Sequence, residues 1–461
     1  MGITIVQKSD LQVPRPWAKK ALVLAGGAMT GASFKAGGLK SLNDYFANYR
    51  ITDFDLFVGI SSGSLVAAPL AAGMSPEELL RILDGSSSHY SVFAPWHFYF
   101  PNIKEVIVRP ITFAYERLIH IPRAVRGMIG NWQMYGPRVV HAVWRLLREP
   151  TGAHYEATVN LVTAMLTMRA GPDWLQMLPT GIFDNSPIER YLRRNIERNH
   201  LTNSFQVTER VRGKKLYICA MMLDGARRVV FGPDERSDVT ISEAVQASTA
   251  LPIFYKPARI KGVDYVDGSV FETAPIDVAV NKGAELIVCY NPFRPIENEV
   301  VLEYIRKQNR YVTKGRPLAA SGFLPVLNQI FRSVFHSRLR ISLEQLRQDP
   351  KFTGDIILIE PSTSDMAFFE LNPLIYSNRV KAAKLGFESV RNSIEEHFDE
   401  VARILAAYGI TMTRTSVEAD AKRLREAGKD AGRWQAVLEG RNQAAKRRSA
   451  TSPTRARRTR T

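Results

Sequence analysis

The chain is poor in cysteine and has no long apolar run. It contains 2 cysteines in 461 residues, which excludes a disulfide-rich secreted scaffold. Cys219 and Cys289 both lie in apolar runs typical of buried strands, so we expect reduced core residues without a role. No stretch of about 18 or more apolar residues occurs, and the N-terminus lacks the apolar centre of a signal peptide. We therefore expect a cytoplasmic protein, with peripheral attachment to a membrane left open.

Acidic residues are in short supply relative to basic ones. The chain has 62 Lys and Arg against 45 Asp and Glu, a formal net charge of +17. Such a balance favours contact with anionic surfaces, either lipid head groups or nucleic acid. No nucleic-acid recognition motif accompanies the charge, so an anionic membrane is the expected partner. The sequence does not indicate an oligomeric state.

Short apolar runs alternate with helical patterns along most of the chain. Strands are predicted at 20–25, 54–59, 215–223, 227–231, 284–290 and 355–360. Helices are predicted after the glycine-rich turn at 26–31, after Ser61, and at 76–83, 240–247, 297–310 and 373–395. This alternation predicts an α/β fold with a central, mostly parallel sheet flanked by helices.

Composition divides the chain into three parts. Residues 1–17 are predicted to be a leader and 18–410 the main domain. That domain contains a basic, aromatic-rich helical insert at about 87–180. Residues 411–461 are predicted to be a basic extension, disordered at its end because nothing acidic follows Glu439.

The insert contains one clearly amphipathic segment, GPRVVHAVWRLLRE, which predicts a helix starting at Pro137. Its valines and leucines share one side, whereas Arg138, Arg145 and Arg148 share the other. An apolar face flanked by arginines suits a membrane interface, but a structural cap over the core explains it equally well. Both hold if the insert is a lid that admits lipid to a site beneath it.

The segment FVGISSGSL places a serine between a predicted strand and a predicted helix. Gly59 and Gly63 flank Ser61 at two residues on either side. Small neighbours allow a strand and helix to pass close together through a tight turn, which exposes the serine at the edge of the sheet. The helix N-terminus then supplies N–H groups that suit an oxyanion. Ser61 is therefore the candidate nucleophile.

A serine hydroxyl needs a base, and Asp267 is the best candidate. It follows a short apolar segment and precedes Gly268, where a turn can direct its side chain. In a dry site a carboxylate bonded to the serine can accept its proton. His336 and His397 follow Ser61 in the chain, but their surroundings are those of ordinary helical residues. A histidine-dependent triad remains the alternative.

Three separated motifs together resemble the patatin-like phospholipases. They are GGAMTG at 26–31, GISSG at 59–63 and DGS at 267–269, supported by GIFDNSPIERYL at 181–192 and ASTALPIFYKP upstream of the aspartate. The resemblance covers roughly residues 18–86 and 180–400. It implies a patatin-like three-layer fold and a Ser–Asp dyad, Ser61 and Asp267, acting on acyl esters of lipids. It also implies an oxyanion hole formed by Gly26, Gly27 and Ala28, with no metal and no cofactor.

The chain departs from the family pattern at three positions. Ala28 stands where the family has a third glycine, Thr30 where it has Arg or Lys, and Ser269 where it has Gly or Ala. Ala28 brings a Cβ to a position that needs an unusual φ, and Thr30 removes a nearby positive charge. Acyl hydrolysis is the expected activity. Acyl transfer to another alcohol, and a catalytically silent membrane-binding protein, are the alternatives.

Overall fold

The computed structural model describes residues 2–167, 178–298, 300–305, 310–314 and 317–440. Contacts divide the chain into two compact units. The second unit consists of Pro101–Asp184 with Ile253–Lys256, and the first contains the remaining described residues. Residues 87–100, which we assigned to the insert, therefore cluster with the first unit. The predicted disordered end lies outside the described residues.

The first unit contains a nine-stranded mixed sheet. Its order is β1 (Ile3–Gln7), β13 (Asp355–Ile359), β10 (Ala284–Tyr290), β2 (Lys19–Leu24), β3 (Leu56–Ile60), β5 (Lys215–Met222), β9 (Val263–Asp267) and β8 (Ala258–Ile260), with β6 (Arg227–Phe231) also paired to β5. The five strands from β13 to β5 are parallel to one another. The remaining four strands pair antiparallel at the two sides. The predicted α/β class is confirmed.

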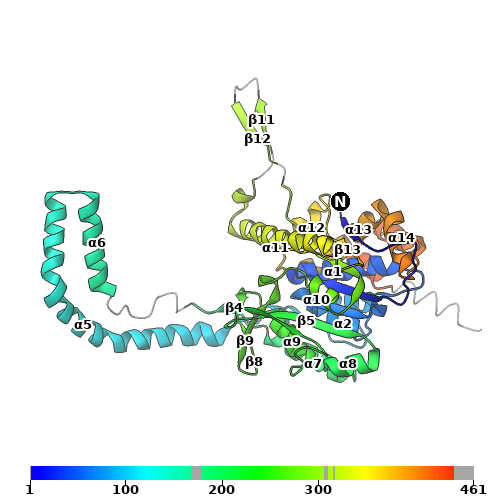
Figure 1. Ribbon diagram of the computed structural model, residues 1–461, viewed down its shortest axis with the longest axis horizontal. Coiled ribbons are helices and arrows are strands. Elements are labelled where there is room, and N and C mark those ends of the chain that lie inside the picture. The colour runs from blue at the N-terminus through cyan, green and yellow to red at the C-terminus, as the bar shows by residue number, and fades with distance from the viewer. Residues whose placement is uncertain (1, 168–177, 299, 306–309, 315–316, 441–461) are drawn as a thin grey trace, which may run out of the picture. The chain divides into compact units, whose positions relative to one another are not determined.

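Helices cover both faces of this sheet (Figure 1). On one face, α10 (Ile276–Asn281) and α11 (Phe323–Gln348) share a core cluster with Val58 and Ile60 of β3. On the other, α1 (Ala28–Tyr45) and α2 (Ser62–Ala71) pack beside Gly59 and Tyr290. Helix α13 (Arg379–Glu396) packs on α1, and α9 (Ile241–Ser248) packs on α2 and β5. Because strand side chains alternate between faces, each central strand contributes to both layers.

The remaining helices of the first unit lie mainly in the connections and near the C-terminus. They are α3 (Pro76–Asp84), α4 (Pro95–Phe98), α7 (Ser186–Arg198), α8 (Phe205–Arg212), α12 (Met366–Phe369), α14 (Phe398–Ala407), α15 (Thr415–Glu426) and α16 (Ala431–Leu438). The extension after residue 411 thus includes two ordered helices, α15 and α16. Residues 3–7, within the predicted leader, form β1 and pair with β13.

In the first unit, one prediction about local structure was wrong and another misplaced the start of a helix. The described residues within 297–310 are not helical as predicted, because β11 (Val301–Ile305) pairs antiparallel with β12 (Arg310–Lys314). Both segments are rich in β-branched and tyrosine residues, which favour strands. The helix predicted at 373–395 begins only at Arg379, after a 3-10 turn at Tyr376–Asn378.

The second unit is mostly helical. Helix α5 (Ile103–Arg148) is followed by α6 (Gly152–Thr167), which packs against it, and β4 (Gly181–Phe183) pairs in parallel with β7 (Ile253–Tyr255). Pro137 lies inside α5 and does not start a helix as predicted. Among the helices of the described chain, none offers a stretch both long enough and apolar enough to span a bilayer.

Candidate functional site

Ser61 occupies a strained turn between β3 and α2. Its backbone has φ 54° and ψ −133°, a left-handed conformation that is rare for a residue with a side chain. The turn needs small neighbours, because a Cβ on Gly63 would lie 2.0 Å from the Leu24 carbonyl oxygen. A Cβ on Gly59 would lie 2.7 Å from the Ser64 Cα. The two flanking glycines therefore permit the close crossing of strand and helix that the sequence predicts.

Hydrogen bonds from a neighbouring helix hold this turn in place. The Ser61 N–H donates to the Ser248 hydroxyl at 2.8 Å, and that hydroxyl donates to the Cys219 carbonyl oxygen at 2.6 Å. Ser64 donates from its hydroxyl to the Ser61 carbonyl oxygen at 2.6 Å. Ser248, the last residue of α9, thus ties Ser61 to β5. The sequence contained Ser248 in a block that resembles the family, but nothing there indicated its function.

Asp267 ends strand β9 and is fully buried. The ladder between β5 and β9 sets it opposite Ala220, while Ile60 lies opposite the adjacent residue, Cys219. One carboxylate oxygen, Oδ1, accepts from the Ser269 N–H at 2.8 Å. The other, Oδ2, has no close, well-aligned partner among the described groups. The structure thus brings Asp267 to the strand end beside Ser61.

The surroundings of Asp267 favour a proton acceptor near neutral pH. Burial raises the pKa of its carboxyl to about 6, whereas the Ser61 hydroxyl, the Ser269 N–H and the Ser269 hydroxyl lower that pKa. The Ser61 hydroxyl therefore lies near enough to affect this carboxylate, although the contact falls short of a well-formed hydrogen bond. Catalytic hydrogen bonds are often long in structures without substrate. A carboxyl with such a pKa is ionised above pH 6 and binds a proton more readily than ordinary aspartate.

The predicted oxyanion loop packs directly against Ser61. A Cβ on Gly26 would lie 3.2 Å from the Ser61 Cβ and 2.8 Å from the Ser269 hydroxyl oxygen. The N–H groups of Met29 and Thr30 both donate to the Pro373 carbonyl oxygen at 3.1 Å. Within the described chain, no group accepts from the N–H of Gly26, Gly27 or Ala28. Three free donors thus gather where the sequence predicts an oxyanion hole.

The departure at Ala28 has a structural counterpart. Gly27 has φ 148°, which a glycine tolerates, but Ala28 has φ 51°. A left-handed alanine costs on the order of 1–2 kcal/mol relative to an ordinary conformation. The substitution therefore leaves the loop in place and adds strain to it. Thr30 is buried and lies in the first turn of α1.

The two histidines considered as alternatives have other neighbours. His336 lies on α11, with its Nε2 atom 3.3 Å from a carboxylate oxygen of Glu360. His397 follows α13, with its Nδ1 atom 3.1 Å from the Ser393 carbonyl oxygen. Among the side chains that the structure describes, no His, Cys, Asp or Glu cluster is arranged to hold a metal ion.

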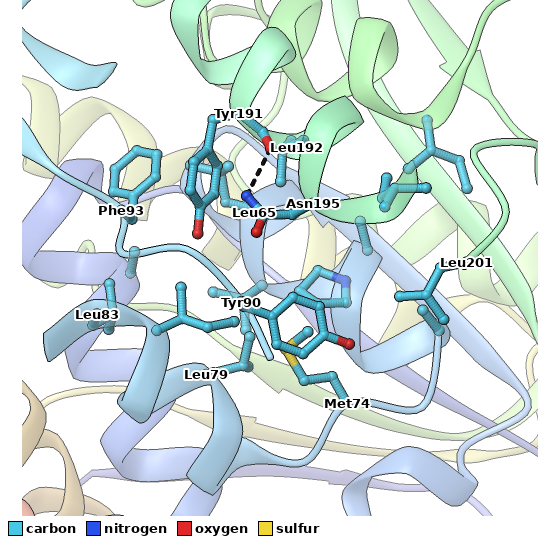
Figure 2. Close-up of a pocket in the computed structure, with 18 of the residues that line it drawn as sticks. Leu65, Met74, Leu79, Leu83, Tyr90, Phe93, Tyr191, Leu192, Asn195 and Leu201 are labelled. Atoms are coloured by element: carbon cyan, nitrogen blue, oxygen red, sulfur yellow. Dashed lines mark hydrogen bonds between the residues drawn. The ribbon is translucent and has the colours of Figure 1, made fainter. Parts of the chain in front are cut away.

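An apolar cavity begins one helical turn from Ser61. It has a volume of about 130 Å³, and its walls come from α1, α2, α3, α7 and the segment before α4. Met29 and Leu65 line its walls, and Leu65 lies four residues beyond Ser61, about 6 Å along the helix axis. Figure 2 shows Leu79 and Leu83 on one side and Tyr191, Leu192 and Asn195 on another.

Two polar side chains in this wall, those of Asn195 and Tyr191, are already bonded to the protein. The Asn195 side-chain amide donates to the Tyr191 carbonyl oxygen at 2.9 Å (Figure 2), and its Oδ1 atom accepts from the Ser91 N–H at 2.8 Å. The Tyr191 hydroxyl donates to the Ser91 carbonyl oxygen at 2.6 Å. These bonds leave a surface that suits an apolar ligand such as an acyl chain.

Comparison with known proteins identifies the family. The patatin-like phospholipase family model matches residues 22–280. A probable lipid hydrolase, 463L of invertebrate iridescent virus 6, is 22% identical over 270 residues, which are 58% of this chain and 65% of the viral protein. The chain thus matches less than two thirds of that relative's length.

Two solved structures match the chain with low overall similarity. VipD from Legionella pneumophila has a TM-score of 0.35 at 13% identity, over 99% of this chain and 84% of its own. The human GIVD cytosolic phospholipase A2, in complex with methyl gamma-linolenyl fluorophosphonate, has a TM-score of 0.35 at 11% identity, over 87% and 60%. The sequence match covers more than half of the chain and all three predicted motifs, and on that basis the chain belongs to the patatin-like phospholipase family.

Proposed function

We propose that the chain is a serine lipid acyl hydrolase, with Ser61 as nucleophile and Asp267 as its base. The observation that carries this proposal is the convergence of three separate segments. These are a strained serine turn, a loop with free N–H groups that packs against it, and a buried carboxylate whose pKa responds to the Ser61 hydroxyl. Membership of the patatin-like phospholipase family and the viral lipid hydrolase relative favour the same reaction class.

The reaction divides into two balanced steps. The Ser61 oxygen attacks the ester carbonyl carbon as its proton moves to Asp267, and the carbonyl electron pair becomes an oxyanion. The oxyanion collapses, the bond to the alcohol breaks, and Asp267 returns the proton to the leaving oxygen. Water then attacks the acyl-serine by the same route, which releases the fatty acid and restores Ser61.

The free N–H groups of Gly26, Gly27 and Ala28 are the proposed donors to the oxyanion. Preorganised donors stabilise charge that develops only in the transition state, so they raise the rate of the chemical step. Loss of one such donor typically slows a reaction by about 10² to 10³-fold. The strain at Ala28 is consistent with a loop held in a functional conformation.

An acyl chain is the proposed occupant of the apolar cavity. The cavity begins near Met29, which follows the oxyanion loop, and Leu65, which follows Ser61. An ester held at Ser61 would therefore have an apolar space within reach of its chain. Because the side chains of Asn195 and Tyr191 already form hydrogen bonds within the protein, they do not require a polar ligand.

A fluorophosphonate probe tests the nucleophile and the base. We expect the folded protein to be labelled covalently, with loss of fluoride, and Ser61→Ala to abolish the label. Asp267→Asn should slow labelling and ester hydrolysis by at least about 10²-fold, as typical for loss of general-base assistance. Ser41→Ala is the matched control, because Ser41 is a buried serine of α1 without a hydrogen-bond partner in the described chain.

Different outcomes separate the alternatives. Folded wild-type protein that takes no label would overturn the proposal and identify a silent member of the family. A label that persists in Ser61→Ala would exclude Ser61 as the nucleophile. Product analysis with an added acceptor alcohol distinguishes transfer from hydrolysis, because transfer yields a new ester in place of free fatty acid.

We also propose that α5 contacts an anionic membrane. Exposed apolar side chains recur along it at helical spacing, including Ile107, Ile111 and Tyr115, and further on Val140 and Leu147. Leu147 is 78% exposed, far more than a core-facing leucine. Arginines flank this apolar stripe, an arrangement that suits the boundary between acyl chains and phosphates.

A further inference from the structure

A lysine is buried beneath the oxyanion loop. Lys35 lies in the first half of α1, and its side chain is fully buried. Its ammonium group donates to the carbonyl oxygen of Ala25, to that of Gly26 at 2.9 Å, and to the Ser62 hydroxyl at 3.1 Å. These three acceptors use the three protons of the ammonium group. All three acceptors are neutral groups. Burying a cation without a carboxylate bound to it costs free energy, so a lysine at this position suggests a function.

The two backbone bonds fix the direction of the loop. In a trans peptide the carbonyl oxygen and the following N–H point in opposite directions. Because Lys35 binds the carbonyl groups of Ala25 and Gly26, it directs the N–H groups of Gly26 and Gly27 to the opposite side of the chain. Those N–H groups have no acceptor in the described chain. Gly26 itself lies against Ser61.

Lys35 also acts electrostatically on the site. Burial lowers the pKa of its ammonium group to about 7, while Asp267 and Cys289 raise it. In return, the charge of Lys35 lowers the pKa of Asp267. Burial raises the pKa of the Cys289 thiol well above its usual value, so that group is neutral near pH 7. The charged form of Lys35 therefore favours the charged form of Asp267, and the reverse also holds.

We propose that Lys35 is a positioning residue for the reaction at Ser61. Its ammonium group holds the loop carbonyls so that the oxyanion donors face the substrate, and its charge keeps Asp267 in the form that accepts a proton. Lys35 touches neither the substrate nor the Ser61 hydroxyl. The inference rests on the proposed acyl hydrolase function. It also locates a cation near the loop although Thr30 replaces the basic residue typical of the family.

The other charged groups near this region are engaged elsewhere. Arg228 of β6 binds both Glu272 and Asp277, at the start of the segment that follows Asp267. Glu360, which acts on Cys289, lies 3.3 Å from His336. Lys35 and Asp267 each act on the charge of the other, and we therefore attribute the pH dependence of the site to this pair.

The unmodified protein gives the first test. The rate of fluorophosphonate labelling should rise as pH increases through about 6, when Asp267 loses its proton, and fall as pH increases through about 7, when Lys35 loses its proton. The result expected is a narrow bell-shaped profile. A rate that stays constant from pH 7 to pH 10 would overturn the proposal without affecting the assignment of Ser61.

Substitutions give the second test. Lys35→Met, which removes charge and donors, should lower kcat by about 10- to 100-fold, less than the 10²- to 10³-fold loss of a direct oxyanion donor, with little change in KM. It should also abolish the fall at high pH and move the rise at low pH to higher pH. Lys35→Gln, which keeps donors without charge, should recover part of kcat but not the fall at high pH.

Lys20→Met is the matched control. Lys20 is also buried and donates to two backbone carbonyl groups, those of Pro16 at 2.7 Å and Ala18 at 3.0 Å, but it lies at the opposite end of β2. The Lys20→Met substitution should leave the pH profile of labelling unchanged. Folded Lys35→Met with the kcat and profile of the wild type would overturn the inference alone. Wild-type protein that takes no label would overturn the proposed function and this inference together.

Discussion

Ser61 and Ala28 both have a positive φ, which most residues with a side chain avoid. Their φ values are 54° and 51°, and each such residue costs on the order of 1–3 kcal/mol. The surroundings maintain both, since Ser248 and Ser64 bind the backbone of Ser61, and Pro373 binds the two N–H groups that follow Ala28. The strain is therefore concentrated in the two segments proposed to form the nucleophile and the oxyanion hole.

The burial of Asp267 is expected to make the free energy of unfolding of the protein fall as pH rises. Because burial raises its folded-state pKa from 3.8 to about 6, the folded protein binds this proton more tightly than the unfolded chain does. The associated stability is fully present below pH 3.8 and is lost as pH rises through about 6. Asp267→Asn removes this loss, so its free energy of unfolding relative to wild type should increase by about 2–3 kcal/mol between pH 4 and pH 7. Denaturant unfolding at several pH values measures the difference.

Asp264→Asn provides the comparison on the same strand. Asp264 is only partly buried, and its carboxylate lies 3.8 Å from Arg259. The free energy of unfolding of Asp264→Asn, relative to wild type, should vary with pH much less than that of Asp267→Asn. A difference for Asp267→Asn that stays constant with pH would show that the folded state does not hold this proton tightly.

The sequence located part of the site and missed another part for a physical reason. Ser61, Asp267 and the loop at 26–28 lie in short local patterns of glycine, serine and aspartate. Lys35 and Ser248 are ordinary residues in helices, and their role depends on which strands and helices the fold brings beside them. One signal was present for Lys35, because α1 carries small or apolar residues on all its sides and so predicts burial all round.

At the scale of elements, local patterns were reliable where the hydrophobic sequence and the sheet agreed. The central strands are continuous apolar runs, as expected of parallel strands covered on both faces. The helix prediction for residues 297–310 was wrong because the pairing of β11 with β12 overrides the helical spacing of apolar residues. Strand β1 was missed because it is short, and its partner, β13, lies some 350 residues away in the chain.

Helix α5 gives the prediction for membrane contact. Arg138, Arg145 and Arg148 are exposed, and the Arg148 guanidinium lies 5.1 Å from the centre of the Trp144 ring. Each basic residue near an anionic surface contributes about 1 kcal/mol to binding. Replacing all three with Glu should weaken binding to vesicles containing phosphatidylserine by about 100-fold or more, with little effect on vesicles of phosphatidylcholine alone. Co-sedimentation with vesicles measures the change.

The control must change the net charge by the same amount at other places. Arg210 of α8, with Arg340 and Arg347 of α11, are exposed arginines of the first unit. Their replacement with Glu should weaken binding much less if α5 is the contact surface. Equal losses in the two triple variants would indicate that overall charge, and not α5, determines binding. Unchanged binding in the α5 variant would indicate a structural role for its arginines.

At the scale of the whole molecule, the C-terminal helices are joined to the first helix of the domain through buried charges. Lys40 of α1 lies 3.0 Å from Asp420 of α15, and each side chain is 2% exposed. Asp44 also pairs with Lys40, and burial raises the pKa of its carboxyl to about 7. The contact links residues 380 positions apart, so it joins a helix that follows the second strand of the sheet to a helix that follows the last strand.

Removal of the Asp420 carboxylate should therefore destabilise the whole unit without altering the chemistry at Ser61. Asp420→Ala leaves Lys40 buried with one fewer partner, and breaking a buried pair in this way costs about 3–5 kcal/mol. Because Asp44 remains, we expect a loss near the lower end of this range, measured by denaturant unfolding at pH 7. Glu426→Ala, an exposed site on the same helix, should change stability by less than about 0.5 kcal/mol. Folded Asp420→Ala should react with the fluorophosphonate probe at the wild-type rate, since the pair lies farther along α1 than Lys35. A slowed reaction in that folded variant would mean that the position of α1 couples the buried charges to the oxyanion loop.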